Sequence, residues 1–292
     1  MQQLLTTLLS GLTLGMVYAA FALALVMIWR STRVVNFAQA PMAMVTTYVA
    51  LTLINNGVSY WVAFVAALLS GFVLGAVVER FIVRWVEGKS EVNAVILTLG
   101  LFIVLHALAA LVFGSSFQSF PAPFGLQGFR VGDTTIALTG FGVFQIVAVV
   151  IVMLALLALF IKTDIGLRMR AAALNPEVAR LLGVRVGGML TLGWALAAVV
   201  GSLSGLLIAG GSLVHPSYMD SVVVYGFVAA VLGGLDSPHG AVVSGVSLGI
   251  VLQVVNGYVS PALMPMAGLL ILVLVLLVRP GGLFSRTATR KV

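Results

Sequence analysis

Residues 4–29 read LLTTLLSGLTLGMVYAAFALALVMIW, a run without a single charged side chain. An α-helix rises 1.5 Å per residue, so about 20 apolar residues cross the hydrocarbon core of a bilayer. The run is too long for the apolar core of a signal peptide, and no basic residue precedes it. We therefore interpret it as a first membrane span.

The composition of the whole chain agrees with this interpretation. Of the 292 residues, 61% are hydrophobic and 8% are charged, whereas soluble domains carry about 25% charged residues. This excludes a water-soluble enzyme, a nucleic-acid-binding protein and a disordered chain. The net charge of +7 does not indicate nucleic acid, because the basic residues form short clusters between apolar runs. The absence of cysteine excludes disulfides and thiolate metal sites.

Further apolar runs predict an all-α, polytopic transmembrane helical bundle that forms a single transmembrane domain over residues 1–292. The spans are predicted near 34–54, 59–78, 92–113, 140–161, 188–211 and 262–278. Two shorter apolar stretches, 222–234 and 241–256, form either two spans or one re-entrant hairpin. The total is nine spans, or seven plus a hairpin.

The basic residues predict the orientation of the bundle. All Lys and Arg residues except Arg130 fall in four segments that the predicted spans place on one side. The segments are 30–33, 79–91, 162–187 and 279–292. Because positively charged loops stay in the cytoplasm, we expect the N-terminus outside, the C-terminus inside, and 114–139 as the largest outer loop.

Four predicted spans contain Gly-x-x-x-Gly, which lets two helix backbones approach closely. The motifs are Gly11/Gly15, Gly71/Gly75, Gly201/Gly205 and Gly245/Gly249. We interpret them as helix-packing sites within the bundle; the alternative is a seam between subunits.

The predicted spans lack the charged residues that ion-coupled carriers place at mid-membrane. No Asp or Glu lies inside a span; Glu79 ends the third, and with Arg80 and Arg84 it is expected in a solvated inner loop. His106 is interpreted as a hydrogen-bonded packing residue, the alternative being a proton relay. We also find no catalytic, cofactor or metal-binding pattern. The energy for any transport is therefore expected to come from another protein.

The inner loop 162–187 contains a predicted short helix with its own start and stop. Asn175 suits the N-cap, Pro176 the first helical position, and Glu177 the positive end of the helix dipole. Gly183 suits the C-terminal stop. Val178, Leu181 and Leu182 form an apolar stripe, and the flanking arginines are Arg168, Arg170, Arg180 and Arg185. Docking into an ATPase subunit is favoured over an interfacial helix anchored to anionic lipid.

This loop resembles the signature loop of importer-type ABC permeases, more narrowly the branched-chain (hydrophobic) amino-acid permeases. The matching pattern is Gly166-x-Arg168-x-Arg170-Ala171-Ala172-Ala173-x-Asn175-Pro176-Glu177-x-Ala179-x-x-x-Gly183. Three other segments are similar to the same family: VNFAQ at 35–39, LGGLxSxxGA at 232–241 and RPxGLF at 279–284. Gln39-Ala40 stand where that family more often has His-Gly.

The resemblance implies an importer subunit of the bacterial plasma membrane. It implies a second, related permease, two cytoplasmic ATP-binding subunits and an external solute-binding protein as partners. It places ATP hydrolysis on the partners, so this chain is expected not to be an enzyme. The residues implied to couple to the ATPase are Arg168, Arg170, Ala171, Asn175, Pro176, Glu177, Arg180 and Gly183.

Residues at the start of the second span are candidates for the translocation pathway. They are Asn36, Phe37, Gln39 and Pro41. Proline there can break a helix and leave backbone groups lining a cavity; the alternative is an ordinary helix start. We expect a solvated outer loop at His215, Pro216, Tyr218 and Asp220.

Three alternatives for the function stay open at this point. The first is a permease of the same architecture for urea, an amide or a sugar. The second is a stand-alone channel or secondary carrier, which would work without an ATPase. The third is a non-transport membrane scaffold whose inner helix recruits a partner.

Overall fold

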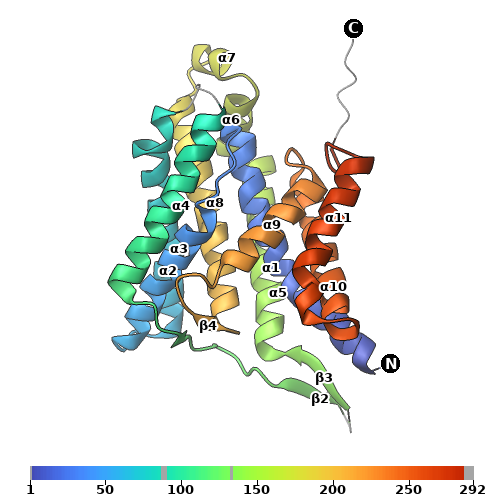
Figure 1. Cartoon of the computed structure of the whole chain (residues 1–292). Coiled ribbons are helices and arrows are strands. Elements are labelled where there is room, and N and C mark those ends of the chain that lie inside the picture. The colour runs from blue at the N-terminus through green and yellow to red at the C-terminus, as the bar shows by residue number, and fades with distance from the viewer. Residues whose placement is uncertain (1, 87–90, 132–133, 286–292) are drawn as a thin grey trace.

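The computed structural model describes residues 2–86, 91–131 and 134–285 and is dominated by long helices (Figure 1). Its helices are α1 (Gln2–Thr32), α2 (Gln39–Asn55), α3 (Tyr60–Phe81), α4 (Glu91–Phe113), α5 (Gly140–Lys162), α6 (Asp164–Leu174), α7 (Pro176–Leu181), α8 (Val186–Ala209), α9 (Asp220–Gly233), α10 (Pro238–Tyr258) and α11 (Met264–Val278). Two 3₁₀ turns, η1 (Val83–Trp85) and η2 (Pro261–Leu263), precede α4 and α11.

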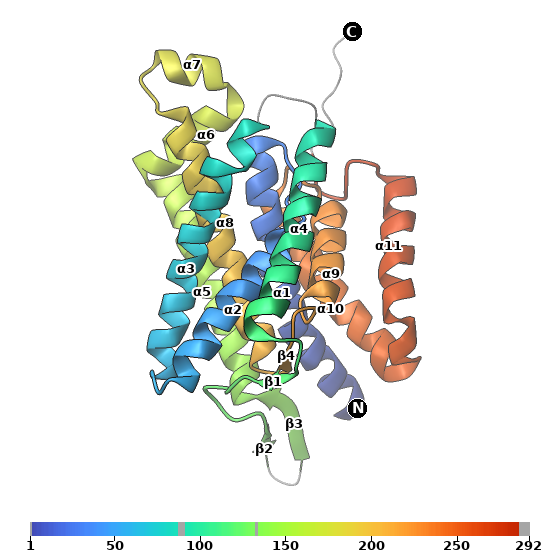
Figure 2. The ribbon, with the colours of Figure 1, turned by 60° about the vertical axis from the view of Figure 1, so that its left-hand side comes forward.

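Four short strands lie at the end of the bundle opposite α7 (Figures 1 and 2). They are β1 (Gln118–Ser119), β2 (Gly128–Val131), β3 (Thr134–Thr139) and β4 (Leu213–Val214). β2 pairs with β3 as an antiparallel hairpin, and β1 pairs with β4, with Gln118 opposite Val214. The predicted loop 114–139 is therefore tied to the segment that follows α8.

The basic segments gather at one end of the bundle. That end, which we call the basic end, carries α6, α7, the last turns of α1 and α3, and the end of α11 (Figure 1). The opposite end, which carries the β2–β3 hairpin, is called the hairpin end. Residues 87–90 and 286–292, which hold the other basic residues of these segments, lie outside the described residues. That the basic end faces the cytoplasm stays a prediction.

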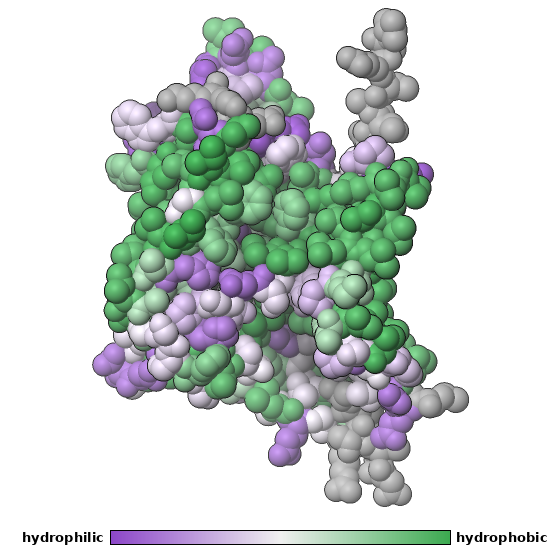
Figure 3. Space-filling view, viewed as in Figure 1, coloured by the Kyte–Doolittle hydropathy of each residue, from purple (hydrophilic) through white to green (hydrophobic). Residues whose placement is uncertain are grey.

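α1 and α8 form the centre of the bundle and are mostly buried, whereas α4, α5 and α11 are mostly exposed. The exposed surface of these outer helices is rich in Leu, Val and Ile, and the surfaces of α4 and α11 contribute to the apolar area in Figure 3. A helix that is apolar all round is stable when protein or lipid covers it. The bundle therefore has the surface of a membrane protein, as the sequence predicts.

In the described part of the chain, seven helices are long and apolar enough to cross a membrane, and their bounds lie close to seven of the predicted spans. α2, at the predicted 34–54, has 17 residues. The stretches 222–234 and 241–256 correspond to α9 and α10. α10 has 21 residues, whereas the 14 residues of α9 extend only about 21 Å. The number of spans therefore stays a prediction.

All four glycine motifs lie in contacts between helices of this chain. Gly11 and Gly15 of α1 face the motif of α10: a Cβ on Gly15 would lie 2.7 Å from the carbonyl oxygen of Val246, and the space at Gly249 is filled by Gly15 itself. At Gly245 the neighbour is the backbone of Ala19. The two motifs therefore let α1 and α10 touch backbone to backbone.

The other two motifs lie at contacts of α8, one on α3 and one on α8 itself. Gly71 and Gly75 of α3 face α8, where a Cβ on Gly75 would lie 2.6 Å from Cβ of Ala198. On α8 itself, Gly201 and Gly205 make room for polar side chains of α2 rather than for its backbone alone. The residues accommodated there are described below.

Replacing Gly15 by Val tests the contact between α1 and α10. The new side chain meets the main chain of Val246, so we expect a loss of stability of about 1–3 kcal/mol. The measurement is the thermal unfolding midpoint of the detergent-purified protein. Gly100→Val in α4 is the matched control, because nothing lies within 4 Å of that position; equal midpoints for the two variants would contradict the packing described here.

Candidate functional site

Helix α7 begins at a side-chain cap. Asn175 precedes it in an extended conformation, and its Oδ1 accepts a hydrogen bond of 3.1 Å from the backbone N–H of Val178. Pro176 is the first helical residue and Glu177 lies in the first turn, where the helix dipole favours a negative charge. The start of this helix is therefore as predicted.

The end of α7 is equally well defined. Gly183 adopts a φ of +80°, which an L-residue with a side chain rarely takes. Its N–H donates to the carbonyl of Arg180 at 3.0 Å, and the N–H of Val184 donates to the carbonyl of Ala179 at 2.9 Å. These two bonds make a Schellman motif, the stop that the glycine predicts.

One face of α7 holds it to the bundle and the other is free. Ala179 is buried against Ala172 of α6 and Val186 of α8. On the free side, 87% of Leu181 and 76% of Leu182 is exposed. Most of the predicted apolar stripe is thus an uncovered surface at the tip of the basic end, far from the hairpin (Figure 2).

Helix α6 is the part of this loop that the sequence analysis missed. It starts at Thr163, whose Oγ1 accepts a 3.1 Å hydrogen bond from the N–H of Gly166. Thr163 followed by Asp164 is a usable N-cap signal. The coupling candidates Arg168 and Arg170 lie on α6 and are exposed, Ala171 is half-buried, and Arg180 is exposed on α7.

Asn36 and Gln39 form a buried polar contact between α2 and α8. Neither residue has exposed surface. Asn36 Nδ2 donates to Gln39 Oε1 at 3.0 Å, and Gln39 Nε2 donates to the carbonyl of Ala197 at 2.9 Å. Gly201 leaves the space that the Gln39 amide occupies. In this conformation the two amides therefore tie helices together and border no open space.

The other two pathway candidates, Phe37 and Pro41, lie in the same segment of the chain. The Phe37 ring is half-buried, with its centroid 6.0 Å from that of Phe227 on α9. Pro41 is buried in the first turn of α2, and Asn36 accepts a hydrogen bond from the N–H of Ala38 in the preceding turn. This arrangement is that of an ordinary helix start, so a role in the pathway stays a prediction.

Tyr218 is buried, so the expected solvated loop is wrong at this residue. Its hydroxyl lies 2.8 Å from Thr47 Oγ1 of α2 and 3.2 Å from the carbonyl of Gly205 of α8. Burial raises the pKa of Tyr218 well above its usual value, so the phenol stays protonated and donates. No local sequence pattern predicts this contact.

His106 links α4 to the start of α9. Its Nδ1 lies 3.1 Å from the carbonyl of Phe102 and its Nε2 lies 3.2 Å from Asp220 Oδ1. Both ring nitrogens thus face an acceptor, and a neutral imidazole donates from only one of them. That His106 is a packing residue rather than a proton relay stays a prediction.

Glu79 is fully buried, so the predicted solvated inner loop is wrong at this residue. Both of its carboxylate oxygens lie 2.9 Å from Arg84 Nη2, and Thr191 Oγ1 of α8 donates to Oε2 at 2.5 Å. A buried carboxylate is tolerated when it is paired and hydrogen-bonded. Glu79, Arg84 and Thr191 are together called the Glu79 clamp below.

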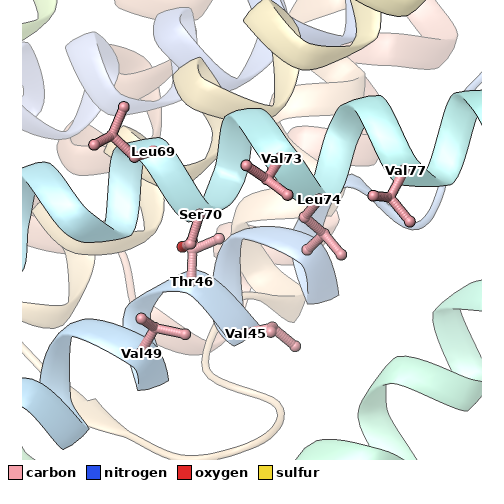
Figure 4. A pocket seen from close by; sticks show the side chains of 8 residues that line it. All are labelled: Val45, Thr46, Val49, Leu69, Ser70, Val73, Leu74 and Val77. Atoms are coloured by element: carbon pink, nitrogen blue, oxygen red, sulfur yellow. The ribbon is translucent and has the colours of Figure 1, made fainter.

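A groove of about 510 Å³ runs between α2 and α3 (Figure 4). It is lined by Val45, Thr46, Val49, Leu69, Ser70, Val73, Leu74 and Val77. The hydroxyls of Thr46 and Ser70 donate to carbonyls of their own helices at 2.8 Å. The groove therefore presents an apolar wall and offers a charged solute no partner.

Comparison with known families agrees with this arrangement. The model of a family described as the permease component of branched-chain amino acid transport systems matches residues 7–279. The chain belongs to this family. It is therefore a multi-pass permease subunit of an ABC system in the plasma membrane and not an enzyme.

The permease resembles characterised family members over nearly its whole length. It is 29% identical over 296 residues to the high-affinity branched-chain amino acid transport system permease protein LivH of Salmonella typhimurium, covering 97% of this chain and 96% of that one. To BraD of Pseudomonas aeruginosa it is 28% identical over 305 residues, covering 99% and 98%. A solved inward-facing ABC transporter shares the fold, with 17% identity, a TM-score of 0.51 and coverage of 94% and 85%.

Metal chemistry finds no support in the described part of the permease, where no group of three or more His, Asp or Glu side chains could hold an ion. The polar groups singled out above instead join helices.

Replacing Gln39 by Leu tests the buried contact between α2 and α8. The change removes the hydrogen bond to the Ala197 carbonyl and leaves the Asn36 amide without the Gln39 oxygen, so we expect the permease to lose about 1–3 kcal/mol of stability. The thermal midpoint in detergent is the measurement. Asn55→Leu, at an exposed amide at the other end of α2, is the control; a midpoint for Gln39→Leu no lower than that of the control contradicts the contact.

Proposed function

We propose that this chain is the membrane subunit of an importer for branched-chain or other hydrophobic amino acids, driven by separate ATPase subunits that dock on loop 162–187. The single observation that supports this most directly is the structure of α7. This helix is capped at both ends and has solvent-exposed leucines at the tip of the basic end. The chemical character of the solute rests on the family relationship.

Docking on a protein explains α7 better than anchoring in lipid. In Figure 2 the helix stands beyond the ends of α3 and α4, on the far side of α6 from the bundle. If those helices cross the bilayer, α7 lies outside its hydrocarbon core. Exposed leucines there gain nothing from acyl chains, but they suit an apolar pocket of a partner protein.

Two further partners, a second permease and an external solute-binding protein, are proposed for surfaces that this chain does not cover. α4 and α11 bury little of their apolar surface within the chain, so we propose that a second, related permease covers part of it. The hairpin end is the proposed docking side of an external solute-binding protein. The proposed pathway residues Asn36, Phe37, Gln39 and Pro41 would become accessible when α2 moves relative to α8.

The solute class is tested directly by uptake. We expect ATP-dependent uptake of radiolabelled leucine by vesicles that contain the permease with the products of its neighbouring genes. Urea, an amide or a sugar moving in place of leucine would support the same architecture for another solute. Leucine movement without any ATPase subunit would instead indicate a stand-alone channel.

Crosslinking tests the docking site. The chain has no cysteine, so Leu181→Cys introduces a single thiol at the tip of α7. We expect it to crosslink to an ATPase subunit in the assembled complex. Leu126→Cys, which is exposed in the segment that leads to β2 at the hairpin end, is expected to form no such product. Crosslinks from position 181 to phospholipid alone would refute docking.

Replacing Gly183 by Pro tests whether the stop of α7 matters for transport. Proline requires a φ near −65° and lacks the N–H that bonds to Arg180, so the end of α7 cannot form. We expect uptake to fall at least about tenfold, with the protein still present in the membrane. Gly57→Pro makes the same change at a glycine with φ +85° in the turn after α2. Equal uptake by the two variants, per molecule in the membrane, would argue against the coupling role.

A further inference from the structure

The Glu79 clamp is a polar group that neither the family relationship nor the proposed docking site assigns to a task. Glu79 lies near the end of α3 and has no exposed surface, and the Arg84 side chain is 31% exposed in η1. Both residues sit at the basic end, close to where α8 begins.

Arg84 bridges two segments of the chain. Its Nε and Nη2 lie 3.1 and 2.9 Å from Glu79 Oε1, so one edge of the guanidinium faces the carboxylate. The same Nη2 lies 2.9 Å from the carbonyl of Gly187 and 2.8 Å from Thr191 Oγ1, both in the first turns of α8. One side chain thus fixes the start of α8 to the end of α3.

The start of α8 is also where α7 is attached. Val186, the first residue of α8, packs on Ala179 of α7. One residue further on, Gly187 gives its carbonyl to Arg84. Towards the middle of the bundle, Gly75 keeps α3 and α8 in contact at Ala198. α7, the first turns of α8 and the end of α3 therefore form a continuous series of contacts.

We propose that the Glu79 clamp transmits movement of α7 to α3, so that Glu79, Arg84 and Thr191 act as positioning residues in coupling ATP hydrolysis to transport. This inference rests on the proposed docking of an ATPase at α7. Within the described residues the main contacts of α7 are with α6 and α8, so a push on α7 reaches α3 by way of α8. The Glu79 clamp joins α3 to the first turns of α8, which is the part of that helix next to α7. The ion pair suits such a link, because Glu79 without Arg84 would be an uncompensated buried charge.

The test uses the complete complex in vesicles, with leucine uptake and ATP hydrolysis measured on the same sample. In Glu79→Gln we expect leucine moved per ATP hydrolysed to fall at least about fivefold, while hydrolysis continues. Arg84→Lys keeps the positive charge but loses the forked set of donors. We therefore expect it to move more leucine per ATP hydrolysed than Arg84→Gln does. Arg80→Gln, at the exposed neighbour of Glu79, should leave the ratio unchanged.

A second readout is independent of the solute. Spin labels at Leu181→Cys and Phe81→Cys report the distance between α7 and α3, and both positions are exposed. With the clamp intact we expect one narrow distance distribution with and without ATP. In Glu79→Gln, ATP should shift or broaden it. If Glu79→Gln does not accumulate in the membrane, Thr191→Val, which keeps the ion pair, takes its place.

The results separate this inference from the proposed function. An unchanged ratio and an unchanged distance distribution in the clamp variants, while position 181 still crosslinks to the ATPase, overturn the clamp alone. A fall in uptake and hydrolysis in equal proportion assigns the clamp to structure only and also overturns the inference. Failure of Leu181→Cys to crosslink to the ATPase when the clamp is intact overturns the docking site itself.

Discussion

The constraint on which the rest of the structure depends is that lipid offers no hydrogen bonds. A polar group that the bundle buries can find a partner only inside the protein. The Gln39 amide meets the Ala197 carbonyl, the Tyr218 hydroxyl meets the Gly205 carbonyl as well as Thr47, and the Glu79 clamp includes Thr191. All three of these contacts end on α8. Satisfying the polar groups of α2, α3 and the loop before α9 therefore places α8 at the centre of the bundle.

Glycine makes this arrangement possible along α8. Without a Cβ at Gly201 the Gln39 amide reaches the α8 backbone, and at Gly205 the same absence makes room for Thr47 and Tyr218. α3 approaches the opposite stretch of α8 through its own glycines, Gly71 and Gly75. Small residues in membrane helices are usually discussed as devices for van der Waals packing. Here two of them have a second effect, because they admit side chains whose donors bond to backbone carbonyls of α8.

The sequence predicted well those features that depend on neighbouring residues. Hydropathy over about 20 residues located the long helices, and the pattern from Asn175 to Gly183 predicted both ends of α7. The predictions failed where burial depends on residues far apart in the chain. Glu79 reads as a solvated carboxylate because Thr191 lies more than a hundred positions away. β1 and β4 are too short to leave a pattern, since each has two residues, and their pairing joins Gln118 to Val214.

The distribution of charge within the bundle explains why this permease needs an external source of energy. A coupling ion requires a charged group that is free to bind it near mid-membrane. The buried carboxylate Glu79 is already held by Arg84, and His106 is engaged by Asp220. The groove between α2 and α3 adds only hydroxyls that are bonded to their own helices. The polar groups named here therefore hold helices together, and several of their contacts converge on α8, the helix that packs against α7 at the basic end.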